Sequence, residues 1–551
     1  MSLPDFSTQA ALFSTAGLNT ELFGPTDRYR LFAQKIYPLL VASRPKLKAL
    51  YCPDNGRSAV EPVLLAGVSL WQYLEGVPDR EAEELLRYHA GWNFALNRNV
   101  GDKGFHPTVL VYFRKRLIEA DQSGLIFRQV LEGLVEAGLV ARSSKQRLDA
   151  TQVFGLVSRM SWLDCVRESL RLAWQELAES AAGFGRPTWW AELRERYVES
   201  KLDYKAPAQT LEKKLQEAGQ DAARLLNWVK SLSDEAIGSG KQVALLQRVF
   251  DEQFEVVGAA EQVQHRQILS SDRVQNPHEP EARYAAKGQG KQKKEHVGYK
   301  IQVAETVVEG PLSPGEPTRN FLTGMVTHPA QESDQAGAEK MAVEQEAMGL
   351  EKPPTLYVDA AYVSGEKIAE AAAEGRKLMG PAAHSPPNNQ GRFTAEQFQV
   401  DVEKRQAICP AGKENTQCSR LEEQESGKVN FRFEWSTHCH GCPLRERCVG
   451  PSQKHRTLVV GGHYTALQAR RVEQQSEAFG QEMKQRNAIE GTQSELVRAH
   501  GLRRARYRGL AKVRWQNYLA GAACNAKRWI RRTMWEMKQA LKETTPAVDS
   551  A

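Results

Sequence analysis

The order of strand-like and helix-like stretches is the feature that most constrains how this chain can fold. Residues 147–154 alternate between apolar and polar side chains, which predicts a strand, and an acid stands in the middle of it. The later strands are predicted at 299–304, 321–327, 355–359 and 376–379, and the helices that alternate with them at 333–348, 366–373 and about 466–498. With two long insertions set aside, the order is β-β-β-α-β-α-β-α.

That order is the order of an RNase H-like fold. We therefore expect an α/β protein with an RNase H-like core, a mixed five-stranded sheet with helices, in which the first and fourth strands are adjacent. The expected boundaries are a helical N-terminal module at 1–140, the first strand at 141–156, a helical insertion at 157–267, the core at 268–380, a Cys-rich insertion at 381–459, the C-terminal part of the core with a basic segment at 460–540, and a disordered tail at 541–551.

Length and composition exclude several classes of protein. The chain has 551 residues, 41% of them apolar, so it is not mainly disordered and can bury a large core. Its apolar stretches fall short of the ~18 residues that a membrane span needs. Residues 1–19 lack a basic stretch followed by an apolar one, so we expect no secretory signal and a cytoplasmic location.

The positive charge is concentrated in one segment. The whole chain has 74 Lys and Arg against 67 Asp and Glu, a net charge of +7. Residues 486–532 hold twelve basic and two acidic residues, so this segment alone carries +10 and the remainder is slightly acidic. A localised positive field of this kind attracts a polyanion, for which nucleic acid is the natural candidate.

Guanidinium groups bind phosphate in a bidentate manner, so a cluster rich in Arg favours nucleic acid over a merely solvated helical face. Tyr507 and Trp515 lie among these arginines and either stack on bases or pack in the core. The candidate DNA contacts are Arg486, Arg498, Arg503, Arg504, Arg506, Arg508, Lys512 and Arg514 in the C-terminal segment, Lys291, Lys293 and Lys294 with Lys287 in a Gly-containing loop, and Arg114, Lys115 and Arg116 in the N-terminal module.

Three acids stand at informative places in the predicted order. Asp149 lies in the first strand, Asp359 ends the fourth, and Glu490 lies on the last long helix. Carboxylates that converge in this way suit Mg²⁺, and two such ions about 3.5–4 Å apart can activate a hydroxyl and stabilise a leaving oxygen in phosphoryl transfer. Acids at single strand ends are usually only solvated. Their joint placement beside the basic segment is what indicates a site.

These motifs resemble the DDE transposases of bacterial insertion sequences, most closely the insertion-sequence family numbered eleven-eighty-two, related to the IS-four/IS-five superfamily. Leu148-Asp149-Ala150-Thr151 is similar to the strand of the first acid, and Asp359-Ala360-Ala361-Tyr362 to the family's Asp-x2-Tyr. Arg486 and Glu490 fit its Arg-x3-Glu. Other stretches that resemble the family are at 60–117, 271–283, 298–302 and 501–528.

The resemblance implies a transposase whose N-terminal module and basic segment bind the terminal inverted repeats of a DNA element. It implies catalytic Asp149, Asp359 and Glu490, two Mg²⁺ or Mn²⁺ ions, strand cleavage and strand transfer, and a homodimer on DNA. Met483 and Val497 depart from the Tyr and Lys of the wider signature, so Arg498 is expected to take the phosphate contact of that Lys. A DNA-binding protein without catalysis and a purely hydrolytic nuclease stay open as alternatives.

Five of the eight cysteines fall between Cys409 and Cys448. Cys439 and Cys442 form a Cys-x2-Cys pair, a spacing that suits tetrahedral Zn²⁺, and four protein ligands would make such a site structural. We expect the ligands to be Cys409, Cys439, Cys442 and Cys448. Spacing alone leaves Cys418, His438 and His440 open as substitutes, and a loose set of reduced thiols is the alternative to any zinc site.

Overall fold

The computed structural model describes residues 2–3, 15–18, 21–53, 56, 58–99, 101–203, 205–232, 234–258, 262–268, 270, 272–288, 293–384, 391–424 and 427–544. Of the predicted features, Lys291 and residues 545–551 of the expected tail lie outside these ranges. None of the helices in the described ranges combines the length and the apolar character needed to cross a membrane.

The N-terminal module is helical. Its elements are α1 (Thr15–Leu18), α2 (Arg28–Leu31), η1 (Phe32–Ile36), α3 (Tyr37–Ala42), α4 (Arg44–Lys48), α5 (Pro62–Glu75), α6 (Asp79–Tyr88), α7 (Ala90–Ala95), α8 (Thr108–Glu119) and α9 (Leu125–Glu136). Helix α5 is buried on almost every side, with Trp71 at its centre. The hydrophobic core of the module continues into the central sheet and into Trp515 near the C-terminus, so the module shares one core with the rest of the molecule.

The central sheet is mixed. Its strands are β1 (Gln146–Phe154), β4 (Arg283–Lys287), β5 (Lys294–Thr306), β6 (Leu322–Pro329), β7 (Thr355–Tyr357) and β8 (Lys377–Met379). The order is β6-β5-β1-β7-β8, in which β5 runs antiparallel to β1 and β6, and the last two strands run parallel to β1. The first and fourth predicted strands, now β1 and β7, are therefore neighbours as expected.

The expectation of five strands is wrong, because the sheet has six. β4 pairs with the first residues of β5 and β6 with the later ones, so both lie on the same edge of this long strand. β5 begins five residues earlier than its alternation suggested, because its first residues are polar and exposed and are held by the hairpin with β4 rather than by burial.

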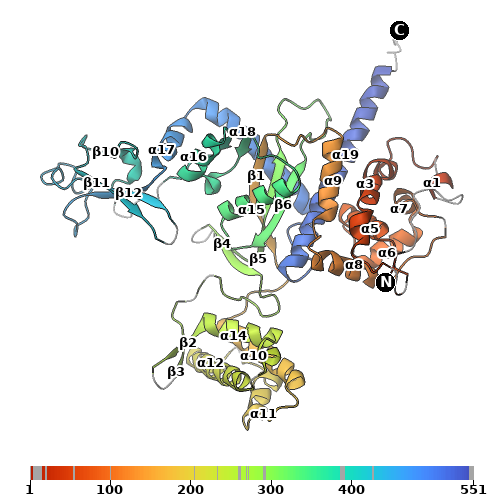
Figure 1. Cartoon of the computed structure of the whole chain (residues 1–551), viewed down its shortest axis with the longest axis horizontal. Coiled ribbons are helices and arrows are strands. Elements are labelled where there is room, and N and C mark those ends of the chain that lie inside the picture. Colours follow the sequence, from red (N-terminus) through yellow and green to blue (C-terminus); the bar gives the residue numbers. More distant parts are fainter. Residues whose placement is uncertain are drawn as a thin grey trace.

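Helices cover both faces of this sheet (Figure 1). α15 (Asp334–Ala347) and α16 (Gly365–Ala373) pack on the face to which Leu148 points. α18 (Glu477–His500) and α19 (Leu510–Thr544) pack on the opposite face, with Val153 and Val303. Successive side chains of a strand point to opposite faces, so the residues of β1 alternate between these two layers.

The single long helix expected at 466–498 is in fact two helices, α17 (Tyr464–Glu473) and α18. Ser476 ends the break between them by accepting a hydrogen bond from the backbone N–H of Phe479, which caps α18. A Ser in this position satisfies an otherwise unpaired donor and starts a new helix. The apolar periodicity continues across the break, which is why it did not reveal the interruption.

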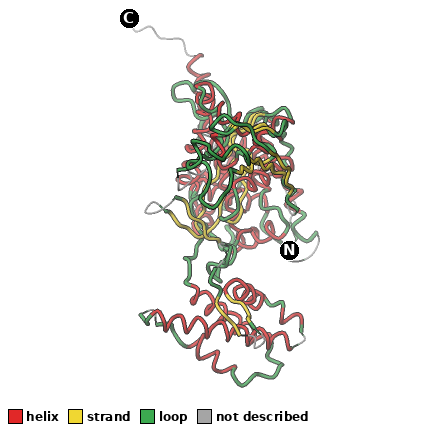
Figure 2. The backbone as a smooth tube through the Cα atoms, turned by 90° about the vertical axis from the view of Figure 1, so that its left-hand side faces the viewer, coloured by secondary structure: helices red, strands yellow, loops and turns green. Residues whose placement is uncertain are grey.

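The helical insertion has its own hydrophobic core and lies apart from the sheet (Figure 2). It consists of α10 (Trp162–Ser180), α11 (Trp190–Leu193), η2 (Arg194–Glu199), α12 (Ala208–Ser231), α13 (Glu235–Gly238) and α14 (Lys241–Gln253), followed by the hairpin of β2 (Phe254–Val257) and β3 (Gln262–His265). The sequence patterns predicted the helices but not this terminal hairpin.

The Cys-rich insertion forms a second separate core at the left of Figure 1, at the end of the molecule opposite the N-terminal module. Its elements are η5 (Ala395–Gln397), β9 (Gln399–Asp401), β10 (Gln406–Ile408), β11 (Gln417–Glu422), β12 (Val429–Glu434) and β13 (Thr457–Gly461). The last three strands form an antiparallel sheet, on which Trp435 and Phe433 are buried.

Candidate active site

Asp149 lies on the face of β1 that α18 covers, with its side chain 14% exposed. Two hydrogen bonds of its neighbours on β1 show which residues of α18 lie beside it. Arg147 Nη1 donates to the backbone carbonyl of Gln485 at 2.8 Å, and Gln493 Nε2 donates to the carbonyl of Ala150 at 3.4 Å. Asp149 therefore lies beside the turns of α18 between these two helix positions.

Asp359 lies beside Asp149 because of strand register. β7 pairs with β1 so that Arg147 is opposite Tyr357, and continuing this parallel register by two residues brings Asp359 level with Asp149. Asp359 accepts a hydrogen bond from the backbone N–H of Ala361 at 2.8 Å and so caps the short helix η4 (Ala360–Tyr362). The second acid is thus held at the end of its strand by the turn that follows.

Arg486 of α18 bridges the two aspartates. Its Nη2 lies 3.1 Å from Oδ2 of Asp149 and 3.8 Å from Oδ2 of Asp359. One guanidinium thus lies between two carboxylates that come from neighbouring strands and that would otherwise repel each other. The position between the acids therefore accommodates a positive charge.

Glu490 lies one helical turn beyond Arg486 on α18, but its side chain is exposed. Among the described residues, it does not form a group with Asp149 and Asp359 in which the ligand atoms lie within 4.8 Å of one another. The structure therefore brings two of the three predicted acids together. The third, Glu490, is exposed and lies one helical turn from Arg486 on the same side of α18.

Tyr362 anchors the turn that carries Asp359. It is buried, and its hydroxyl donates to Oε1 of Gln302 on β5. Burial, and then the negative charges of Asp334, Asp149 and Asp359, raise its pKa above the usual value. Asp149 and Asp359, which lie on either side of Arg486, offer only carboxylate oxygens, and such ligands fit a hard divalent cation such as Mg²⁺ or Mn²⁺.

A second group of possible ligands, Glu495, His500 and Cys524, lies between α18 and α19. Arg528 Nε already donates to Glu495 at 3.0 Å, and His500 Nδ1 lies 2.9 Å from the carbonyl oxygen of Tyr73. A buried guanidinium against the carboxylate opposes a further cation there, so we assign no ion to this group.

The four cysteines chosen from the sequence, Cys409, Cys439, Cys442 and Cys448, line one small cavity in the core of the Cys-rich insertion. His438 also reaches this cavity, whereas Cys418 and His440 are not among its described lining residues. Burial, followed by the charges of the other three thiols, raises the pKa of Cys448 to about 11. No three of these sulfur atoms lie within 4.8 Å of one another in the described residues.

The predicted DNA contacts differ in exposure. Arg498, Arg504, Arg508 and Lys512 are exposed, as are Lys115, Lys293 and Lys294. Others have protein partners: Arg503 donates to Thr151 and Gln152, Arg506 lies over the Tyr73 ring, Arg116 over the Tyr51 ring, and Arg514 lies 4.0 Å from Asp121. Arg114 is 8% exposed and pairs with Asp79, so its guanidinium is part of the module's interior in this structure.

Sequence reasoning missed a cluster of arginines and aromatic rings where the helical insertion joins the sheet. Trp162 is partly exposed and stacks on His265 with ring centroids 4.9 Å apart, and Arg273 lies over its ring. Arg159 lies over the Tyr284 ring. The members come from both ends of the insertion, so no local spacing in the sequence could have grouped them.

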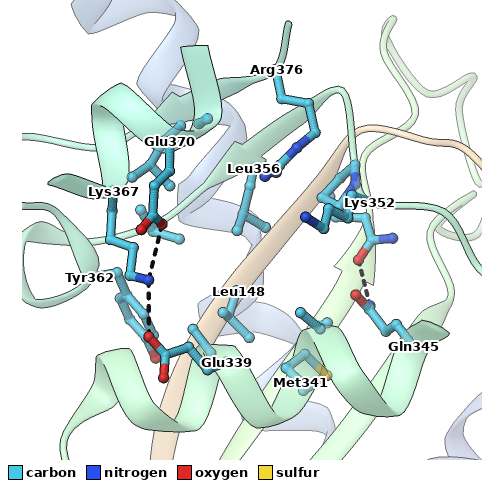
Figure 3. A pocket seen from close by; sticks show the side chains of 18 of the residues that line it. Leu148, Glu339, Met341, Gln345, Lys352, Leu356, Tyr362, Lys367, Glu370 and Arg376 are labelled. Carbon is cyan, nitrogen blue, oxygen red and sulfur yellow. Dashed lines mark hydrogen bonds and ion pairs between the residues drawn. The ribbon is translucent and has the colours of Figure 1, made fainter. Parts of the chain in front are cut away.

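The large apolar hollow between α15 and α16 lies on the face of the sheet opposite α18 (Figure 3). It has a volume of about 660 Å³ and a floor that includes Leu148 and Leu356. At its edge, Lys367 forms ion pairs with Glu339 and Glu370 (Figure 3). It contains none of the three acids, and we assign no ligand to it.

Two parts of the chain match known protein families. Residues 408–530 match the family described as Transposase DDE domain, and residues 20–116 match the one described as Transposase domain (DUF772). The first range contains the cysteines, Arg486 and Glu490, and the second covers most of the N-terminal module. No curated protein matches the chain.

Proposed function

We propose that this chain is a DDE transposase of a bacterial insertion sequence, which cleaves DNA at the ends of its element and transfers the strands to target DNA. Both family matches are to transposase domains and support this class of enzyme. The observation that carries the proposal is the pair Asp149, on β1, and Asp359, just after the end of the adjacent β7, which Arg486 bridges from the helix that bears Glu490. Membership of family eleven-eighty-two is part of the proposal.

The order β6-β5-β1-β7-β8, with its strand directions, supports an RNase H-like catalytic core. In such a core two bound Mg²⁺ or Mn²⁺ ions would activate the attacking oxygen and stabilise the leaving one. Asp149 and Asp359 would supply carboxylates from the sheet. Glu490 would join them from the same side of α18 as Arg486, and Arg486, no longer needed between the acids, would be available to a DNA phosphate.

DNA would be held on several surfaces. The exposed residues Arg498, Arg504, Arg508 and Lys512 lie close in sequence to Glu490 and would contact the phosphates of the terminal repeats. The N-terminal module and the hairpin of β4 and β5, with Lys293 and Lys294, would add further contacts. Because two ends must be cut together, we propose a homodimer on DNA, acting on the bacterial nucleoid in the cytoplasm.

We further propose a structural Zn²⁺ at Cys409, Cys439, Cys442 and Cys448. All four line the same cavity, and thiolates are the ligands that closed tetrahedral zinc sites prefer. The site would stabilise the small Cys-rich insertion, whose strands bury few large side chains.

A second candidate is a transposase-derived protein that binds DNA without cutting it. The spacing of the acids favours this alternative, because in the described residues Glu490 does not lie in one close group with Asp149 and Asp359, and two carboxylates hold metal ions less well than three. A purely hydrolytic nuclease is distinguished from the transposase by the absence of strand transfer into a target duplex.

The test is to incubate the full chain with duplex DNA carrying the element's end and with Mg²⁺, and to map the cuts on each strand. Asp149→Asn should lower cleavage by more than about 100-fold, since losing an ion's direct ligand exceeds the loss seen when an outer partner is removed. DNA binding should persist. Asp334→Asn is the matched control, because Asp334 also acts on Tyr362 but pairs with Lys300. Undiminished cleavage by Asp149→Asn would contradict the assignment.

A further inference from the structure

Two hydrogen bonds attach α18 to the sheet, one just before Arg486 and one just after Glu490. Arg147 Nη1 donates to the carbonyl of Gln485 at 2.8 Å, and Thr492 Oγ1 donates to Oε1 of Glu305 at 2.7 Å. The two attachment points are seven residues apart, about two helical turns, so both lie on the same side of α18.

A buried group of charges lies beneath these attachments. Glu305 of β5 is 0% exposed and lies between two guanidiniums, that of Arg147 at 2.7 Å and that of Arg528. Arg147 and Glu305 are direct cross-strand partners on β1 and β5. Arg528 of α19 also donates to Thr492 Oγ1 at 2.9 Å and to Glu495 at 3.0 Å. Two strands and two helices are thereby joined through one carboxylate.

Stability alone does not account for such a group. Taking charges out of water is costly, and apolar residues of similar volume often stabilise a core equally well. Apolar contacts, however, do not depend on the direction in which two groups approach each other, whereas hydrogen bonds do. If α18 slid by one residue, its atoms would move by about 1.5 Å and turn by about 100°, which would break the hydrogen bonds of Gln485, Thr492 and Glu495. The charged group therefore selects one register of the helix.

We propose that Thr492, held by Glu305 and Arg528, is a positioning residue that fixes α18 so that Glu490 stands level with Asp149 and Asp359 for ion binding. This inference rests on the proposed function, because it assigns a role in ion binding to those acids. Thr492 touches neither an ion nor DNA. It acts only through the helix.

The test uses Thr492→Val, which keeps the shape of the side chain and removes its hydroxyl, and Thr492→Ser, which keeps the hydroxyl. Glu305→Gln is avoided because it strips both buried arginines of their partner and endangers folding. Thr327→Val is the matched control. Thr327 is also buried and accepts a hydrogen bond from Asn517 at 2.9 Å, but it joins β6 to α19 and does not touch α18.

Binding of Mn²⁺ alone to each full-length variant is measured from the loss of the free-ion paramagnetic resonance signal. Thr492→Val should bind Mn²⁺ about 10- to 100-fold more weakly, as when an outer partner of a metal ligand is removed. Thr492→Ser should recover most of the affinity, and Thr327→Val should keep it despite a similar loss of thermal stability.

A second readout locates the ion. Fe²⁺ replaces Mg²⁺, and radicals generated at the bound ion by ascorbate and peroxide cut the nearby backbone. The wild type should be cut near Asp149, Asp359 and Glu490, and Thr492→Val should lose the cut near Glu490 alone. If Thr492→Val behaves as Thr327→Val does, the positioning role is overturned and the proposed function stands. If the wild type binds no ion at these acids, both are overturned.

Discussion

The two candidate metal centres of this chain are assembled in different ways. The four candidate zinc ligands all lie within residues 409–448 and line a cavity inside one small core. Asp149, Asp359 and Glu490 are spread over most of the chain and come from a strand, a turn and a helix. The cysteine centre therefore depends on a local fold, whereas the centre of the three acids depends on how distant elements pack against each other.

The largest loss of stability is expected from Cys442→Ser. If zinc holds the Cys-rich insertion, losing one ligand removes much of the about 10–16 kcal/mol that zinc binding gives to small domains. The insertion should then unfold while the sheet stays intact. Zinc content, measured with a colorimetric chelator, should fall, and limited proteolysis should cut within residues 391–461.

Cys418→Ser is the control, because Cys418 packs against the same core but is not among the described residues that line the cavity. Full zinc content and unchanged protease resistance in Cys442→Ser would remove the basis for treating the two regions as different kinds of metal centre.

The second effect concerns the end of α18 and depends on pH. Burial lowers the pKa of His500 to about 4, against about 6.5 in the unfolded chain. The folded protein therefore keeps this ring neutral while the unfolded chain gains a proton below pH 6.5. The stabilisation is complete above pH 6.5 and is lost as the pH falls toward 4, by up to about 3 kcal/mol.

Urea unfolding at pH 7, 5.5 and 4 checks this expectation, with His500→Gln as the variant that cannot titrate. The variant should lose less stability on acidification than the wild type, and the other histidines, present in both, cancel in the comparison. The Cys-rich insertion should keep its protease resistance. Identical pH dependence in the two proteins would show that the end of α18 carries no such linkage.

The smallest effect is expected from Arg486→Ala. Without the guanidinium, Asp149 and Asp359 face each other with no cation between them, which should cost about 1 kcal/mol for a partly exposed group. Added Mg²⁺ should therefore raise the melting temperature of the variant more than that of the wild type. Arg498→Ala, an exposed change on the same helix, should respond as the wild type does. If Mg²⁺ raises the melting temperature of all three proteins equally, the Arg486 guanidinium does not occupy the position of an ion.

Much of the core could be predicted because its signals are local. The alternation in β1 and the acid within it are visible in eight residues, and the adjacency of β1 and β7 follows from the order of elements. The break at Ser476 and the extra strand β4 escaped because a capping hydrogen bond and a hairpin, rather than burial, define them. The boundaries of the domains and the roles of the site residues stay predictions.

Charge shows the limit of sequence reasoning most clearly. By its sequence, segment 486–532 is one strongly positive stretch, yet Arg528 is buried between Glu305 and Glu495, and Arg532 lies near Glu316. The sequence shows how many charged residues a segment contains, but not which of them form ion pairs, because the partners lie up to hundreds of residues away. The surface field of this segment is therefore weaker than its formal charge.

The sequence by itself determined which residues can form strands and helices, and which acids and cysteines could serve chemistry, since these depend on neighbours along the chain. Only the tertiary structure decided that β1 and β7 are adjacent, that Arg486 lies between Asp149 and Asp359, and that Glu490 is exposed. The physical reason is that strand register and the angle of α18 are set by long-range hydrogen bonds and buried charges, which no local pattern records.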